Sequence, residues 1–109
     1  MNREARDKWT AALRSGKYEQ GYDYLNSNDY YCCLGVLCEV AIESGLEIEV
    51  DASHPATRYD GSISILPDSV AQWAEIDRAG TIDYRNNLPQ YNDTGTNFND
   101  IADIIEKEF

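Results

Sequence analysis

Residues 30–42 read YYCCLGVLCEVAI, the most apolar stretch of this 109-residue chain. Wound as a helix, the stretch places apolar side chains on nearly every side, which is typical of a helix buried in the middle of a domain. Gly35 lowers the helix propensity of the stretch, so we expect it to mark a close approach by another part of the chain. Gly45 is predicted to end the helix.

Amphipathic helices are predicted near both ends of the chain. Apolar residues recur at helical spacing in residues 3–15, between Asn2, a candidate N-cap, and Gly16, a candidate stop. The same spacing predicts a helix over residues 97–108. The face of the first helix that is expected to meet solvent or a ligand carries Arg3, Asp7, Thr10 and Arg14.

Short strands are predicted between the helices. Residues 46–51 alternate apolar and acidic side chains, a pattern that indicates a strand with one exposed face. The dipeptide Asp60-Gly61 lies between residues 57–59 and 62–65, and it favours a tight hairpin turn. The alternation and the turn together predict a small antiparallel sheet.

The remaining segments complete the predicted domain. Pro67 is expected to open a short helix, because proline is tolerated in the first helical turn. We expect a further strand at residues 81–84, and a loop over residues 85–96, where Asn, Gly and Pro are frequent. The predicted fold class is α+β: a single domain over residues 1–109, with a buried central helix, flanking helices and a small antiparallel sheet.

Acidic residues dominate the composition. Twenty Asp and Glu stand against nine Lys and Arg, which gives a formal net charge of −11. This balance argues against direct binding of duplex DNA, whose affinity comes mostly from positive charge near phosphates. Hydrophobic residues make up 42% of the chain, too many for a disordered acidic tail. Residues 1–17 carry five basic and two acidic side chains, a local sum of +3, so they form a basic island on an acidic body.

No targeting or membrane-spanning segment is apparent, so we expect a cytoplasmic protein that does not enter a membrane. The three cysteines, Cys32, Cys33 and Cys38, are odd in number and clustered, which disfavours a disulfide framework. Zinc requires four ligands and His54 is the only histidine, so neither a metal nor a cofactor is predicted. We interpret the thiols as core residues; nucleophilic catalysis through them would have to use His54.

Residues 14–21, RSGKYEQG, combine groups that bind phosphate. Arg14 offers a planar fork to phosphate oxygens, Lys17 adds a point charge and Gln20 an amide, while the glycines let backbone N–H groups approach a ligand. A second interpretation is structural, because basic residues at the end of a helix complement its dipole and pair with carboxylates. Both interpretations remain open at the level of the sequence.

Aromatic and polar residues elsewhere fit the same kind of ligand. Five of the eight tyrosines lie within residues 18–31, and Tyr18 and Tyr31 are expected to stack on a base or to line an interface. Such a surface also suits a homodimer or larger ring with shared ligand sites. Asn92 and Asp93 precede the last helix, where they either fold the turn or contact a ribose or base.

Three sequence blocks carry a resemblance to a known family. They are ALRSGKYEQG at residues 12–21, CCLGVLC at residues 32–38 and NDTGTNFNDIADIIE at residues 92–106. With these blocks the chain resembles a family of small proteins encoded in bacteriophage and prophage genomes. The resemblance implies a viral accessory protein that acts in the cytoplasm of an infected bacterium, where such proteins often counter host defences.

Residues and resemblance together lead us to expect a non-enzymatic anti-defence protein that binds and sequesters a small anionic, nucleotide-type immune signal. The alternative is an acidic DNA mimic, or an inhibitor that docks on a basic host defence protein. An enzyme that acts through Cys32 or Cys33 with His54 is the third hypothesis. The predicted ligand-binding residues are Arg14, Lys17, Tyr18, Gln20, Tyr31, Asn92 and Asp93.

Overall fold

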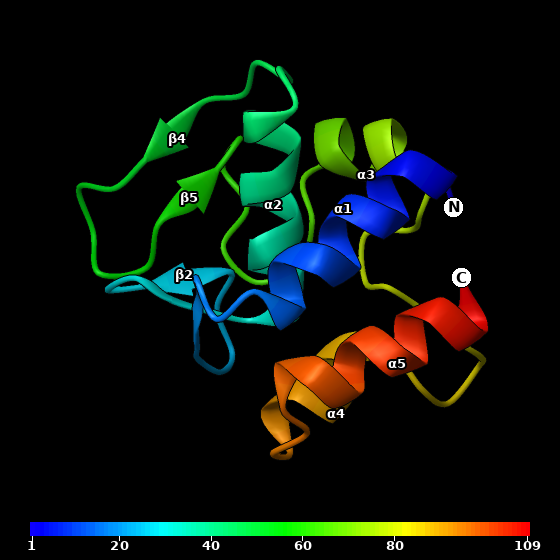
Figure 1. The fold of residues 1–109 in the computed structure, drawn as a ribbon. Coiled ribbons are helices and arrows are strands. Elements are labelled where there is room, and N and C mark those ends of the chain that lie inside the picture. The colour runs from blue at the N-terminus through cyan, green and yellow to red at the C-terminus, as the bar shows by residue number, and fades with distance from the viewer.

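Helix α2 (Cys33–Glu43) lies at the centre of the computed structural model, which describes residues 1–109 (Figure 1). Eight of its 11 residues are buried, which confirms the prediction of a central apolar helix. Gly35 faces the backbone of Leu25, and a Cβ at this position would lie 1.7 Å from the Leu25 carbonyl oxygen. The expected close approach is therefore confirmed. Gly45 follows the end of the helix with a φ of +100°, in the left-handed region that favours glycine.

Helix α1 (Arg3–Arg14) packs against α2 (Figure 1). Asn2 caps α1 as predicted, since its side chain accepts a hydrogen bond from the Ala5 N–H at 2.9 Å. Trp9 is fully buried, and its indole N–H donates to the Cys33 carbonyl at 2.9 Å. This bond joins the middle of α1 to the first turn of α2.

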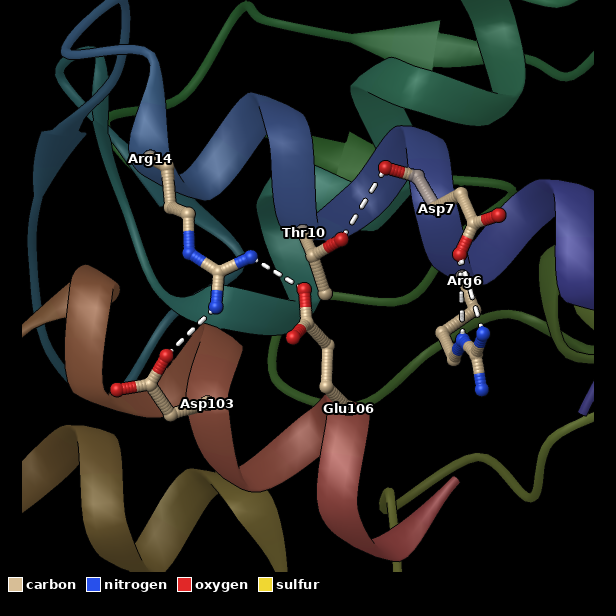
Figure 2. A network of polar contacts seen from close by, with 6 residues as sticks. All are labelled: Arg6, Asp7, Thr10, Arg14, Asp103 and Glu106. Carbon is tan, nitrogen blue, oxygen red and sulfur yellow. Dashed lines mark hydrogen bonds and ion pairs between the residues drawn. The ribbon is translucent and has the colours of Figure 1, made fainter.

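Helix α5 (Phe98–Glu108) packs against α1 (Figure 1). Its apolar face is turned inward. Asn97 caps this helix by accepting from the Asp100 N–H at 2.9 Å. Thr10, which the sequence pattern places on an exposed face, is instead buried, and Figure 2 shows it on the side of α1 that faces α5. Its hydroxyl donates to the Asp7 carbonyl at 3.1 Å, so burial leaves the hydroxyl with a partner.

The two remaining helices, α3 and α4, are shorter. Helix α3 (Asp68–Ala74) begins directly after Pro67, as predicted. Helix α4 (Leu88–Asp93) falls within residues 85–96, so the prediction of a loop there is wrong. A capping box accounts for it: Asn87 Oδ1 accepts from the Gln90 N–H at 3.0 Å, and the Gln90 side chain accepts from the Asn87 N–H at 2.9 Å. None of the helices has both the length and the apolar character needed to cross a bilayer.

Two small sheets lie beside α2 (Figure 1). The first is mixed, with β1 (Glu19–Gln20) parallel and β2 (Asn26–Ser27) antiparallel to the central strand β3 (Tyr30–Tyr31). The second pairs β4 (Val50–Asp51) with β5 (Arg58–Tyr59) in antiparallel fashion. The α+β fold class is thus confirmed, with a mixed sheet added to the expected antiparallel one.

The strands differ from prediction in their extent. The turn at Asp60-Gly61 forms as expected, with φ values of +48° and +83°, and Tyr59 pairs with Ser62 across it. The strand expected at residues 62–65 does not form, and β5 pairs with β4 instead. The strand expected over residues 46–51 is shorter, because the Leu46 N–H bonds to the Ala41 carbonyl at 3.0 Å and closes the end of α2. No strand forms at residues 81–84; there the Asp83 carboxylate accepts from the N–H groups of the next turn.

Candidate ligand-binding site

Arg14, a predicted phosphate-binding residue, is paired within the chain. Its guanidinium donates to Asp103 Oδ1 at 2.6 Å and to a carboxylate oxygen of Glu106, and both partners lie on α5 (Figure 2). The hydrogen bonds to Glu106 and then Asp103 raise the pKa of Arg14 above its usual value. The geometry at Arg14 matches the structural interpretation, since this side chain fastens the end of α1 to α5.

Lys17 lies just beyond α1 and has a single carboxylate partner. Its Nζ is 2.6 Å from Glu43 Oε1, and the Tyr18 hydroxyl donates to the same oxygen at 3.4 Å. The hydrogen bond from Lys17 lowers the pKa of Glu43 below its usual value. Both members of the ion pair are more than half exposed, and exposed pairs contribute little to stability. A ligand can therefore replace Glu43 as the partner of Lys17 at low cost.

A cavity of about 460 Å³ opens beside Lys17, between the second half of α1 and the end of α2. Small-molecule sites have volumes of roughly 300–1,000 Å³, so this cavity is large enough for a ligand of that class. Its lining offers small apolar side chains, the phenol ring of a tyrosine, two serine hydroxyls, two ammonium groups and one carboxylate. The lining residues are Lys8, Ala11, Ala12, Ser15, Lys17, Tyr18, Val40, Glu43 and Ser44.

Lys8 is a lining residue that the sequence pattern did not single out. Its Nζ lies 3.2 Å from Glu4 on the same helix and 3.3 Å from the Ser44 hydroxyl at the end of α2. The sequence did contain a signal that could have pointed to Lys8. Lys8, Ala11 and Ser15 follow one another at helical spacing and so share one face of α1. What the pattern did not reveal is that the end of α2 lies opposite this face.

Tyr18 and Tyr31 contact each other edge to face, with ring centroids 5.1 Å apart and planes at 80°. Tyr18 lines the cavity, and Lys17 Nζ lies 5.3 Å from the centre of its ring. Tyr31 is outside the lining, and burial raises its pKa to about 12. Tyr31 therefore contacts the Tyr18 ring without lining the cavity itself.

Asn92 lies in the interior, where its side chain joins three segments of the chain. Its Oδ1 accepts from the Cys33 N–H at 3.2 Å and from the Gln20 side chain at 3.0 Å. Its Nδ2 donates to the Gly21 carbonyl and to Asp93 Oδ1, each at 2.9 Å. We call these contacts the Asn92 hub; they leave the side chain with no group directed at a ligand.

Gln20 and Asp93 belong to the same hub. Gln20 donates to the Thr96 carbonyl at 2.7 Å and accepts from the Phe98 N–H at 3.1 Å, which fixes the start of α5. Asp93 accepts from the Asp23 N–H at 3.0 Å. Gln20 also borders a smaller hollow of about 260 Å³ with Arg14 and Tyr18. The seven predicted residues therefore do not share one site. Lys17 and Tyr18 line the main cavity, Tyr31 contacts Tyr18, Arg14 pairs with α5, and the hub holds the remaining three, Gln20, Asn92 and Asp93.

All three cysteines are buried. Burial raises the pKa of Cys32 to about 11 and those of Cys33 and Cys38 well above the usual thiol value. Thiolates are the reactive form of cysteine. The raised pKa values keep the three thiols protonated, which fits unreactive residues of the core.

This arrangement predicts slow thiol chemistry in the folded protein. We expect Ellman's reagent at pH 7.5 to modify Cys32, Cys33 and Cys38 only on the timescale of unfolding, because each sulfur is buried and protonated. In 6 M guanidinium chloride all three should react within minutes. Rapid reaction of one thiol in the folded protein would contradict this prediction and restore the thiol nucleophile as a hypothesis.

Comparison with known proteins places the chain in a family but assigns it no activity. No curated protein and no solved structure matches it at a significant level. One family model, described as a domain of unknown function, DUF8296, matches residues 1–109. Since the match covers the whole chain, the protein belongs to the DUF8296 family.

Proposed function

We propose that the protein captures a small anionic, nucleotide-type ligand in the cavity between α1 and α2 and holds it without chemical change. The observation that carries the proposal is the meeting of Lys8, Lys17 and the Tyr18 ring around one cavity of about 460 Å³. On a chain of net charge −11, two ammonium groups beside one cavity make a local site for an anion. Lys8 takes the part that the sequence pattern suggested for Arg14.

The lining groups match the two halves of a nucleotide. Phosphate oxygens accept charge-assisted hydrogen bonds from Lys8 and Lys17, and the Ser44 hydroxyl adjoins Lys8. The Tyr18 ring offers a stacking surface for a base, with Val40 as an apolar neighbour. In this binding mode the phosphate replaces Glu43 as the partner of Lys17.

Sequestration requires only affinity for the ligand, and the groups that line the cavity can supply it. The resemblance to bacteriophage proteins supplies the context that we propose: an accessory protein in the cytoplasm of an infected bacterium, which removes a nucleotide-type immune signal from solution. A ligand that is only sequestered returns unchanged when the protein is denatured. Heat denaturation followed by mass spectrometry of the released ligand therefore separates capture from catalysis.

Replacing the two lysines should weaken binding of phosphorylated probes. We expect Lys8→Ala and Lys17→Ala each to weaken the binding of ADP and of pyrophosphate about tenfold, because each removes a charge-assisted hydrogen bond. Isothermal titration calorimetry of the wild type and both variants measures the change.

Lys107→Ala is the matched control, since it removes the same charge from α5, away from the cavity lining. It should leave both affinities within about twofold of the wild type. Absence of binding to the wild type, or equal losses in all three variants, would refute the proposal and favour the docking alternative.

A further inference from the structure

The segment that forms the first sheet is rich in tyrosine and lacks basic residues. Residues 18–57 contain eight Asp and Glu and no Lys or Arg. Within this stretch three tyrosine side chains are substantially exposed: Tyr22 at 53%, Tyr24 at 40% and Tyr30 at 54%. Exposed tyrosines are common in binding surfaces, because the ring supplies contact area with little loss of conformational entropy.

The strand register places Tyr30 in the middle of the outer face of this sheet. Tyr30 pairs with Glu19 on one side and with Ser27 on the other, and none of the three side chains is buried. Gly21 makes room for Tyr30, since a Cβ on Gly21 would lie 2.7 Å from the Tyr30 Cβ. The opposite row of the sheet, which includes the buried Asn26, faces inward.

The loops around these tyrosines have a defined backbone. Asp23, Asn28 and Asp29 adopt positive φ values of 69°, 54° and 66°. Asp29 is held by an N–H donated to Asn26 Oδ1 at 2.9 Å, and Asp23 is held by its bond to the Asn92 hub. A surface held in this way binds a partner without a large ordering cost.

The carboxylates next to these tyrosines in the chain have no partners within the chain. Glu19, Asp23 and Asp29 are exposed, and none of them takes part in an ion pair. Exposed rings attract cations to their faces, and unpaired carboxylates attract them by charge. The chain already contains one such contact elsewhere, where the Arg85 guanidinium lies 5.1 Å from the centre of the Tyr84 ring.

We propose that this surface docks an arginine-rich segment of a protein partner. We call it the tyrosine surface and define it by six exposed residues that lie close together in the chain: Glu19, Tyr22, Asp23, Tyr24, Asp29 and Tyr30. Arginine fits better than lysine because a planar guanidinium stacks on a ring while it pairs with a carboxylate. A second copy of this chain fits less well, since each copy carries a net charge of −11. The proposal does not depend on the α1–α2 cavity.

Peptides of eight arginines and of eight lysines serve as probes, with fluorescence anisotropy as the measurement. The wild type should bind the arginine peptide several-fold more tightly than the lysine peptide. Tyr22→Ser, Tyr24→Ser and Tyr30→Ser combined should weaken arginine-peptide binding about tenfold and remove the preference for arginine. Tyr84→Ser is the control, because Tyr84 is 89% exposed and lies outside the tyrosine surface. It should change neither the affinity for the arginine peptide nor the preference for arginine over lysine.

A charge variant tests the same surface without altering a ring. Glu19→Gln with Asp29→Asn should weaken arginine-peptide binding more than Asp100→Asn with Glu108→Gln, which removes equal charge from α5. Thermal unfolding identifies any variant that fails to fold. If the triple tyrosine variant is one of these, the comparison of the two charge variants tests the proposal in its place. Equal effects of the two charge pairs, or no preference of the wild type for arginine, would overturn the proposal and leave only attraction by net charge.

Discussion

Gly35→Ala should prevent the chain from folding stably. In an exposed helix this substitution is stabilising, because alanine has the higher helix propensity by about 1 kcal/mol. Here the new Cβ would lie 1.7 Å from the carbonyl oxygen and 2.6 Å from the carbonyl carbon of Leu25, and backbone atoms cannot rotate away. We expect a loss of at least about 3 kcal/mol in the free energy of unfolding, a large part of the total for a domain of this size. Urea denaturation followed by circular dichroism measures it.

Gly95→Ala is the matched control. Gly95 has a φ of +103°, and a Cβ added there would have no atom within 4 Å beyond its neighbours in the chain, so alanine meets only backbone strain. The expected loss is about 1–2 kcal/mol. A Gly35→Ala protein as stable as the wild type would show that α2 and Leu25 do not approach each other as described.

Asn92→Ala should have the second largest effect on stability. The substitution removes a side chain that makes four hydrogen bonds and leaves the Cys33 N–H and the Gly21 carbonyl without their partner in the interior. Unpaired buried polar groups cost about 1–3 kcal/mol each, so we expect a loss of roughly 3–5 kcal/mol in the free energy of unfolding. Asn99→Ala, on the exposed side of α5, should cost less than about 0.5 kcal/mol.

Asn92→Asp adds a pH test of the same hub. Burial next to the Gly21 carbonyl should raise the pKa of the new carboxyl in the folded state above its value in the unfolded chain. A group with a raised folded pKa favours the folded state when it is protonated, so this variant should be closest to the wild type near pH 4. Its stability relative to the wild type should fall as the pH rises toward 7. A deficit that does not change with pH would mean that position 92 is open to solvent.

The candidate site was visible in the sequence only in part. The segment RSGKYEQG pointed to Lys17 and Tyr18, and both line the α1–α2 cavity. Lys8 was missed, because its position relative to the end of α2 depends on how two helices cross. Arg14 and Lys17 lie three residues apart and carry the same charge, yet their surroundings differ. Arg14 meets two carboxylates of α5, while Lys17 meets one exposed carboxylate beside a cavity.

Local sequence was sufficient for α1, α2, α3, α5 and the turn at Asp60-Gly61, because helical periodicity, caps and turn dipeptides act between residues only a few positions apart. The signal for α4 is equally local, since Asn87 and Gln90 form a recognisable capping box, although the frequent Asn, Gly and Pro favoured a loop there. The burial of Thr10, the pairing of Arg14 and the interior place of Asn92 were decided by the tertiary structure alone. Each depends on contacts with distant parts of the chain, as between Arg14 and Glu106, and a pattern within one segment carries no information about which distant segment will cover it.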